Sequence, residues 1–498
     1  MKQKIIFWLG SDLTHYCLAY FLQQKIDADF YAIIDITDKP KKFFETQNLV
    51  KFKKIWFVHD YISKINKPDL DYLSEFEKKF TLNLWKLAIN ERIFYRFYNF
   101  HKFKDNEILS ILENSCKLFE KILNDVKPTI FITKEPTFHH LELFYQLCKV
   151  NDVRTLMLST PNIGYRCIIS EKSVTMDEIN ELSKVTSSNR TFEELQTFLK
   201  TFDLAKQIKN YDISHGNTNK DLFSAALNFL STDNSNLNTH YNYFGRTKIK
   251  VISNIISSYF KRNYRSSFLS NKTLHDVPVE KPFVYFPMAV DLERNLLVGA
   301  PFYTNQIEII RILAKSIPIN YDLIVKEAPG QLTRDWRNIS EYNEILNIPN
   351  VKLLHPSVPA SKIFPKCKLV VTIGGTSGLE AAAYGKASIV FTDVGYVTLP
   401  SVFKINSIDS IPELIQTALN YKVIPDDLDR FLNLLENNSF EFDWMGFGTK
   451  FKNFFYHGGN LVDVEISSKE MESFLKKSEN ELKPLVENHV KKILDMQN

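Results

Sequence analysis

Glycine is scarce in this chain, with 15 residues among 498. Two glycine-dependent phosphate signatures are missing: no GxGxxG follows a strand-like run, and the lysine after Gly385 lacks the GxxxxGK frame. P-loop ATP hydrolysis and NAD binding of the Rossmann type are therefore disfavoured, and no cofactor is expected. Glycines that cluster, such as Gly374 and Gly375, carry more information for this reason.

Cysteine and long apolar runs are also sparse. The five cysteines are scattered and include no CxxC pair, so neither a disulfide framework nor a cysteine zinc site is expected. No apolar run approaches the roughly 18 residues that a membrane helix needs. The start, "MKQKIIFWLGSDLTHYC", has only a short apolar run, which predicts a first strand and no signal peptide. We expect a cytoplasmic protein whose membrane contact is peripheral, at the inner face.

Strong charge of one sign is absent overall. Lys plus Arg (62) and Asp plus Glu (58) leave a net charge of +4, so a nucleic-acid partner is not expected. Apolar residues at 44% and charged residues at 24% are typical of soluble globular proteins. The length allows two large domains with sizeable cores.

Strand-like and helix-like runs alternate in two series, which predicts two parallel sheets covered on both faces. The expected fold class is α/β, with two Rossmann-like doubly wound domains, a helical insertion and C-terminal helices. The predicted domains are 1–172, 173–281 (insertion and linker), 282–465 and 466–498 (helical tail). Expected strands are 4–10, 29–35, 53–61, 128–135, 153–159, 283–288, 321–329, 351–356, 369–375 and 387–394.

The stretch "LVVTIGGTSGLEAAAYG" predicts a strand, a glycine turn and a helix start. This geometry presents free backbone N–H groups and a positive helix end, which suit a phosphate. Gly374 and Gly375 would let the backbone approach closely, Thr376 and Ser377 could donate hydroxyls, and Glu380 could accept from a sugar. The alternative is that Thr376 or Ser377 only caps the helix while Glu380 is solvated.

Two other predicted strand ends carry groups that suit a nucleotide. Lys326 and Glu327 end "YDLIVKEAP", and His355 with Pro356 ends "VKLLHP". Taken separately, Lys326 could be a surface charge and His355 a loop histidine. Taken together with the glycine turn, they predict a phosphate cradle at the carboxyl ends of one sheet.

These residues carry a family resemblance. Residues 282–400 resemble the C-terminal domain of GT-B glycosyltransferases of capsule and surface-polysaccharide biosynthesis, a group that includes the capsular β-Kdo transferases. The matching stretches are "YFPMAVDLERN", "YTNQIEIIRILAKSIPINYDLIVKEAP", "LLHPSVPASKIF" and "VVTIGGTSGLEAAAYGKASIVF". The resemblance implies a nucleotide-sugar donor, with a CMP-Kdo or CMP-nonulosonate type favoured, and a glycan or glycolipid acceptor.

The resemblance implies which residues form the donor site, but two motifs of the family are absent from this sequence. It implies that Lys326, Glu327, His355-Pro356, Gly375-Thr376 and Glu380 surround the nucleotide. Ala328 stands where the family has its first histidine. The Glu-Asp-Gly motif that supplies an acid or base in the Kdo and sialic acid enzymes is missing, and "LSTPNIGYRC" in its place has no carboxylate.

Sugar transfer needs a carboxylate or histidine to accept the proton of the acceptor. At the strand ends of the first domain, Glu135 and Asp12 are ranked equally as this base, ahead of Asp60 with His59. We interpret Glu91 and Arg92 as a solvated pair on a helix. The adjacent His139 and His140 point to different faces of a helix and are interpreted as non-metal residues.

No metal site is expected. The DxD runs at 27–29, 69–71 and 427–429 precede a strand or lie in helical or loop context, whereas a metal-dependent GT-A enzyme needs the motif at a strand end. Three alternatives to a glycosyltransferase remain: a CDP-polyol phosphotransferase, a UDP-sugar 2-epimerase, or a non-catalytic nucleotide-binding assembly protein.

Acidic residues are absent between Asp233 and Asp276, where seven Lys and Arg residues occur. Isoleucines and aromatic residues fall at roughly helical spacing between the basic clusters. A basic helix with an apolar face can lie on an anionic membrane, which predicts a peripheral contact through 246–265. The alternative is a helix that packs its apolar stripe on the core.

Overall fold

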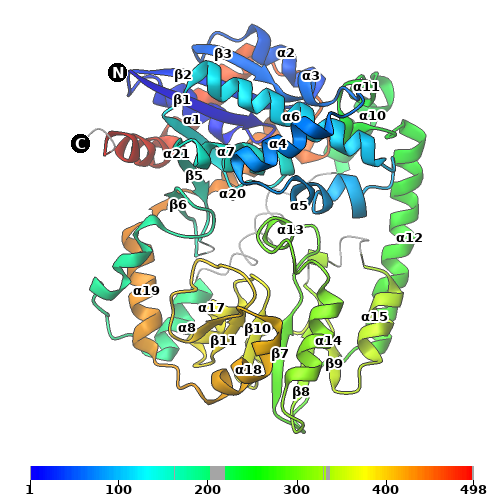
Figure 1. Ribbon diagram of the computed structural model, residues 1–498, viewed down its shortest axis with the longest axis vertical. Helices are drawn as coiled ribbons and strands as arrows, with labels where there is room; N and C mark the ends of the chain where they lie inside the picture. Colours follow the sequence, from blue (N-terminus) through cyan, green and yellow to red (C-terminus); the bar gives the residue numbers. More distant parts are fainter. Residues whose placement is uncertain (1, 162, 202–218, 329, 332–336, 496–498) are drawn as a thin grey trace. The chain divides into compact units, whose positions relative to one another are not determined.

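The unbroken apolar run of the first strand is buried on both faces, as a central parallel strand requires. The computed structural model describes residues 2–161, 163–201, 219–328, 330–331 and 337–495. The chain divides into two units (Figure 1). Unit 1 comprises the described parts of Met1–Asp177, Phe202–Val251 and Asn438–Asn498, and unit 2 comprises Glu178–Thr201 and Ile252–Asn437.

Unit 1 contains a seven-stranded sheet in the order β13-β6-β5-β4-β1-β2-β3. Strands β1 to β5 are parallel, whereas β6 and β13 run antiparallel at one side. The point where the strand order reverses lies between β1 and β4. The strands are β1 (Gln3–Gly10), β2 (Ala28–Asp35), β3 (Phe52–Phe57), β4 (Ile130–Lys134), β5 (Arg154–Ser159), β6 (Arg166–Ser170) and β13 (Phe440–Glu441).

Helices cover both faces of this sheet. Ile5, Phe7 and Leu9 of β1 belong to one apolar cluster with α1 and α21, whereas Ile6 and Trp8 belong to a second cluster with α6 and α7. This alternation follows the two-residue period of a strand. The helices are α1 (Thr14–Leu22), α2 (Asp38–Thr46), α3 (Val58–Ile62), α4 (Leu70–Phe80), α5 (Leu84–Ile89), η1 (Arg92–Arg96), α6 (Asp105–Val126), α7 (His139–Val150), α10 (Asn219–Ser231), α11 (Asn236–Thr239), η3 (Tyr241–Tyr243), α20 (Trp444–Phe455), η6 (His457–Gly459) and α21 (Ser468–Leu494).

Unit 2 contains a six-stranded parallel sheet in the order β12-β11-β10-β7-β8-β9. The order reverses between β7 and β10, as in a Rossmann-type sheet. The strands are β7 (Phe283–Pro287), β8 (Asp322–Lys326), β9 (Val351–Leu354), β10 (Leu369–Thr372), β11 (Ser388–Val390) and β12 (Val402–Lys404).

The helices of unit 2 also pack on both faces of its sheet. Val284 and Phe286 of β7 lie in one cluster with α14, whereas Phe283 and Tyr285 lie in another with α16 and α17. The helices that lie wholly or mostly in unit 2 are η2 (Asp177–Lys184), α8 (Phe192–Thr201), α12 (Lys248–Lys272), α13 (Arg294–Leu297), α14 (Gln306–Ser316), α15 (Ile339–Leu346), α16 (Ala360–Ile363), α17 (Ser377–Ala383), η5 (Ile408–Ser410), α18 (Ile411–Asn420) and α19 (Pro425–Asn437).

The two strand orders confirm the predicted fold class of two Rossmann-like α/β sheets. One predicted strand, 53–61, is wrong in its second half, because β3 ends at Phe57 and α3 follows. That helix turns His59 into the interior, where its Nε2 lies 3.1 Å from Asp35 Oδ1. Among the described residues, no helix has both the length and the hydropathy to cross a membrane.

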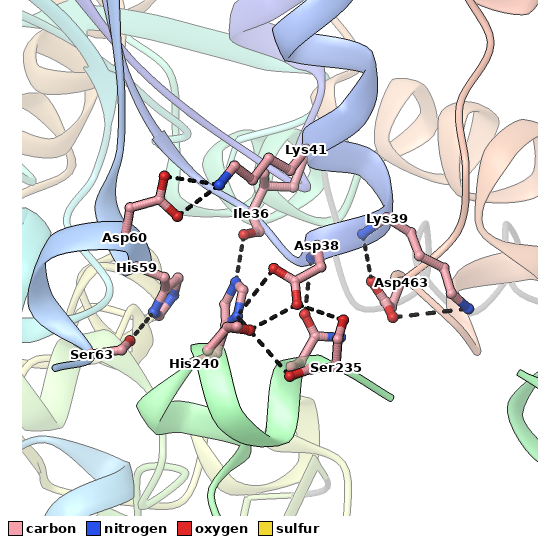
Figure 2. Close-up of polar contacts among 12 residues, drawn as sticks. Ile36, Asp38, Lys39, Lys41, His59, Asp60, Ser63, Ser235, His240 and Asp463 are labelled. Carbon is pink, nitrogen blue, oxygen red and sulfur yellow. Dashed lines mark hydrogen bonds and ion pairs between the residues drawn. The ribbon is translucent and has the colours of Figure 1, made fainter. Parts of the chain in front are cut away.

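The segment expected as one insertion, 173–281, is divided between the units. Figure 2 shows how its 235–240 part is held by the start of α2 in unit 1. Ser235 donates to Asp38 Oδ2 at 2.6 Å, and His240 Nε2 lies 2.8 Å from the Ile36 carbonyl. These hydrogen bonds join residues far apart in the sequence and hold residues 235–240 in unit 1. The composition of the stretch gives no sign of these contacts.

The predicted tail also belongs to unit 1. The antiparallel pair of β13 with β6 and the packing of α21 on α1 return residues 438–495 to the first sheet. The unit boundary at Asn437 therefore differs from the predicted boundary at 465.

Candidate functional site

The carboxyl end of β8 in unit 2 places a buried cation near a carboxylate. Lys326 is 7% exposed, and its Nζ donates to the Val358 carbonyl at 2.9 Å. Burial lowers the pKa of Lys326, while the nearby Glu380 acts in the opposite direction. The structure thus brings Lys326, the loop after β9 and Glu380 together, although they are far apart in the sequence.

The glycine turn after β10 is held by three hydrogen bonds. The Gly375 N–H donates to Thr372 Oγ1 at 3.1 Å, and the Tyr396 hydroxyl donates to the Gly375 carbonyl. Thr376, at the start of α17, donates its hydroxyl to Glu380 Oε1 at 3.2 Å and does not cap its own helix. The exposed Thr376 and the half-buried Gly374 and Glu380 leave this turn open to a ligand.

Ser377, the first residue of α17, holds a buried hydroxyl. Its Oγ has no hydrogen-bond partner among the described residues. A buried hydroxyl without a partner costs free energy unless another group satisfies it. A phosphate or sugar oxygen would supply that partner.

His355 follows β9 and stacks on His275, with the ring centroids 4.6 Å apart. Its Nδ1 lies 2.6 Å from Ser357 Oγ, and the next residue, Pro356, is buried. Burial and the neighbouring His275 lower the pKa of His355, so the ring is neutral at pH 7. The loop from His355 to Val358 adjoins Lys326 through the bond to Val358.

Glu327 lies within a buried polar network. It is 0% exposed, and its Oε2 accepts from Arg337 Nε at 2.7 Å and from the Tyr342 hydroxyl at 2.8 Å. Arg337 also donates to Asp291 at 3.1 Å. We therefore expect Glu327 to fix the end of β8 by its internal bonds. Sequence reasoning missed Arg337 and Asp291, because only the folded chain brings them to Glu327.

Unit 1 has a cavity of about 560 Å³ at the carboxyl ends of β1 and β4, where its strand order reverses. Such reversal points are the usual ligand sites of open α/β sheets. The wall combines aromatic, acidic and basic side chains. They include Asp12, Lys134, Tyr165, Arg166, Trp444 and Tyr456.

Asp12 is the candidate base that lines this cavity. Its carboxylate accepts from the Thr14 hydroxyl at 2.6 Å and lies 3.4 Å from Lys134 Nζ. Burial raises the pKa of Asp12, but Lys134, His15 and Thr14 outweigh it, so the net shift is downward. Asp12 is therefore ionised at pH 7.

Glu135, the other candidate base, has different surroundings. Its Oε1 accepts from the Val174 N–H at 3.1 Å and from the Ser173 hydroxyl at 3.3 Å. Among the described residues that line the cavity, Lys134 is present and Glu135 is not. The structure thus separates two carboxylates that the sequence ranked equally.

Asp35 is a further carboxylate at this edge of the sheet, and sequence reasoning missed it. It lines a small adjoining cavity with Asp12, His15 and Lys134. His140 Nε2 lies 2.8 Å from Asp35 Oδ2, and His59 Nε2 lies 3.1 Å from Oδ1. Burial raises the pKa of Asp35, but the two histidines outweigh it and hold that pKa well below its usual range.

Several histidines of unit 1 contact carboxylates. Glu91 is buried, and its Oε2 lies 3.0 Å from His139 Nδ1. The prediction that Glu91 forms a solvated pair with Arg92 is therefore wrong. Asp60, predicted as a partner of His59, instead pairs with Lys41 at 2.7 Å (Figure 2). Within the described ranges, no group of three or more His, Cys, Asp or Glu is placed to hold a metal ion.

Two Rossmann-like sheets in one chain define a GT-B-like α/β protein. Residues 177–397 match the model of a family described as capsule polysaccharide biosynthesis protein. This match confirms the predicted resemblance over the part of the chain that holds Lys326, His355 and the glycine turn. Among curated proteins, no match is found.

Several solved structures are similar to the chain at low identity. The Thermosulfurimonas dismutans KpsC β-Kdo 2,7 transferase is 13% identical, over 68% of this chain and 89% of that one, with a TM-score of 0.32. The UDP-GlcNAc 2-epimerase of Methanocaldococcus jannaschii is 12% identical, over 87% and 100%, with a TM-score of 0.24. The N-terminal domain of Candida albicans trehalose-6-phosphate phosphatase is 12% identical, over 90% and 96%, with a TM-score of 0.28.

Proposed function

We propose that this chain is a metal-independent glycosyltransferase of surface or capsular polysaccharide synthesis. Its donor is a nucleotide sugar, with the CMP-Kdo or CMP-nonulosonate type favoured, and its acceptor is a growing glycan or glycolipid. The observation that carries the proposal is the grouping of Lys326, the His355 loop and Glu380 beside the glycine turn, within the range of the capsule family match.

In this proposal the donor phosphate binds at the turn of unit 2. The backbone N–H groups at the start of α17 and the Ser377 hydroxyl donate to its oxygens, and the Thr376 hydroxyl turns from Glu380 to donate to the phosphate. Lys326 supplies positive charge close by, which stabilises the phosphate as the bond to the sugar breaks. His355, in the adjoining loop, donates a further hydrogen bond.

The acceptor binds in the cavity of unit 1, and Asp12 accepts the proton of the attacking hydroxyl. Aromatic side chains such as Trp444 and Tyr165 give a sugar ring an apolar surface, and the charged groups fix its hydroxyls. The buried Tyr456 hydroxyl and His15 Nε2 have no hydrogen-bond partners among the described residues. Tyr456 lines the larger cavity and His15 lines the small adjoining one. A ligand with several hydroxyl groups could supply hydrogen-bond partners to both.

We also propose that the enzyme works at the inner face of the membrane through residues 246–265. A lipid-linked acceptor would be held there, and the stretch has no acidic residue. This position and the cytoplasmic location belong to the proposal.

The test is a panel of nucleotides measured by thermal shift, because a ligand that binds the folded state raises the unfolding temperature. We expect CMP to stabilise the chain more than UDP, CDP or ADP. His355→Ala should weaken CMP binding by about 1–3 kcal/mol, the range for a charge-assisted hydrogen bond. His101→Ala, which changes a histidine of unit 1, is the matched control.

Turnover then separates the enzyme classes. Release of CMP from CMP-Kdo in the presence of a glycan acceptor supports the proposal. Conversion of UDP-GlcNAc to its 2-epimer would instead assign an epimerase, and release of CMP from a CDP-polyol would assign a phosphotransferase. Binding without any turnover would assign an assembly protein.

A further inference from the structure

Helix α12 carries an exposed apolar stripe (the long helix labelled in Figure 1). Its exposed fractions range from 41% for Ile252 to 81% for Ile249. Large apolar side chains at this exposure are unusual when they gather on one element. The stripe consists of Ile249, Ile252, Ile255, Ile256, Tyr259, Phe260 and Tyr264.

The stripe lies on one face of the helix. Ile252, Ile256 and Phe260 follow at four-residue steps, and the other members fall three or four residues from these or from one another. The buried residues Arg265 and Leu269 are each nine residues from a member of the stripe, about two and a half turns. They therefore lie on the opposite face. Packing within the fold uses that opposite face and leaves the stripe uncovered.

Basic side chains accompany the stripe, and acidic ones are absent. Lys250, Lys261, Arg262 and Lys272 are exposed. At about 100° per residue, Lys250 and Lys261 lie on one edge of the stripe and Arg262 lies toward the other. No Asp or Glu occurs between Asp233 and Asp276. An amphipathic helix with an exposed apolar face and a basic polar side is typical of helices that lie in a membrane interface.

We infer that α12 lies in the plane of an anionic lipid surface, with this stripe at the boundary between headgroups and acyl chains. The lysines and the arginine beside the stripe contact lipid phosphates, and their aliphatic stems add to the buried apolar area. The helix does not cross the bilayer, because its hydropathy is too low for a spanning segment. A second copy of this chain is a less suitable partner for the stripe, because symmetric pairing of two stripes would bring their basic side chains close to one another.

This inference deepens the peripheral membrane contact of the proposed function, naming the face and the lipid chemistry. It is tested by lipid binding alone. A chain that binds lipid and transfers no sugar would sink the proposed transfer reaction and leave this inference standing. A chain that transfers sugar and ignores lipid would sink this inference and the proposed membrane position, and would leave the proposed transfer reaction standing.

The test is flotation of the full chain with vesicles of phosphatidylcholine alone and with vesicles that contain phosphatidylglycerol, at low and moderate salt. We expect binding to the anionic vesicles only, weakening as salt screens the charges. The double variant Ile256→Ser/Phe260→Ser should bind about tenfold or more weakly. The matched control is Phe302→Ser/Ile319→Ser, which removes two apolar side chains that are 80% and 101% exposed elsewhere in unit 2.

A second pair of variants tests the charges. Lys261→Gln/Arg262→Gln should lower binding to anionic vesicles about tenfold, whereas Lys366→Gln/Lys368→Gln should leave it unchanged. All four side chains are exposed, so the unfolding midpoint of each variant should match the wild type. Equal binding to uncharged vesicles, or no binding at low salt, would overturn the inference. So would a wild-type dimer that the Ile256→Ser/Phe260→Ser variant loses, because the stripe would then cover a second copy.

Discussion

Two carboxylates, Asp12 and Glu135, follow neighbouring strands of one sheet, yet they have different contacts. Asp12 lines the cavity beside Lys134, while Glu135 binds the backbone of Val174. We predict that Asp12→Asn lowers kcat by roughly 10²–10⁴, the usual contribution of a general base. Donor binding should stay unchanged, because the proposed donor site is in unit 2.

The matched control is Glu135→Gln, which should keep kcat within a few-fold of the wild type. Steady-state kinetics and calorimetry of CMP binding measure both quantities. If Asp12→Asn turns over normally while Glu135→Gln does not, the assignment of the base is reversed.

His489, in α21, links stability to pH. It is 0% exposed, and its Nδ1 donates to the Leu485 carbonyl at 2.8 Å. Burial lowers the pKa of His489 to about 3. His15 also lowers this pKa, and the hydrogen bond to Leu485 raises it. The unfolded chain, with a pKa near 6.5, then takes up a proton that the folded chain does not. The contribution of His489 to the free energy of unfolding is thus complete above pH 6.5 and is lost progressively as the pH falls toward 3.

We predict that His489→Gln flattens this dependence, since glutamine does not titrate. Between pH 6 and pH 4.5, the free energy of unfolding of the wild type should fall by up to about 1.4 kcal/mol per pH unit more than that of the variant. Denaturant unfolding at several pH values measures the difference. Parallel curves for the two proteins would show that His489 is not the titrating group.

At the scale of elements, the turn after β10 depends on a glycine within α17. A Cβ at Gly378 would lie 2.6 Å from the Tyr396 hydroxyl oxygen and 3.0 Å from Ser388 Oγ. That Tyr396 hydroxyl binds the Gly375 carbonyl, so displacing it would disturb the turn. We predict that Gly378→Ala lowers the free energy of unfolding by about 1–3 kcal/mol and weakens CMP binding.

Gly448→Ala is the matched control for this prediction. Its Cβ would meet only Phe451 at 3.9 Å, an ordinary contact in helix α20. Alanine there should be neutral or slightly stabilising. Chemical denaturation compares the two variants, and an equal effect of both would contradict the role of Tyr396.

The elements that sequence reasoning predicted well are those whose pattern is local. The apolar runs of β1, β4, β8 and β10 and the glycine turn were predictable, because strand burial and turn geometry depend on adjacent residues. The antiparallel pair of β6 and β13 was missed, since its partners lie far apart in the sequence. A short strand such as β13, with two residues, has no periodicity to detect.

The same limit applied to the candidate site. Lys326, His355 and Glu380 could be named because each lies at a strand end or in the turn. Asp35 and Arg337 could not, because their importance comes from burial and from partners that only folding supplies. Asp12 and Glu135 were likewise separated only by their contacts.

At the scale of the molecule, the proposed chemistry relies on side chains and backbone dipoles for the leaving phosphate. We predict that EDTA leaves the rate of CMP release unchanged, within about twofold, since Lys326 and the turn replace a metal ion. The control is a metal-dependent transferase treated in the same buffer. Loss of activity in EDTA that Mn²⁺ restores would contradict this prediction.

The return of residues 438–495 to unit 1 has a consequence for how the protein is made. Phe447, Phe474 and Leu485 pack in the same apolar cluster as Ile5 and Phe7. A ribosome releases the first strand long before these helices, so one face of the first sheet is covered only in part during most of translation, while the second sheet is completed earlier. A nascent chain therefore needs protection from aggregation until α21 emerges. A product that ends before α21 would leave the part of this apolar face that α21 covers exposed to solvent.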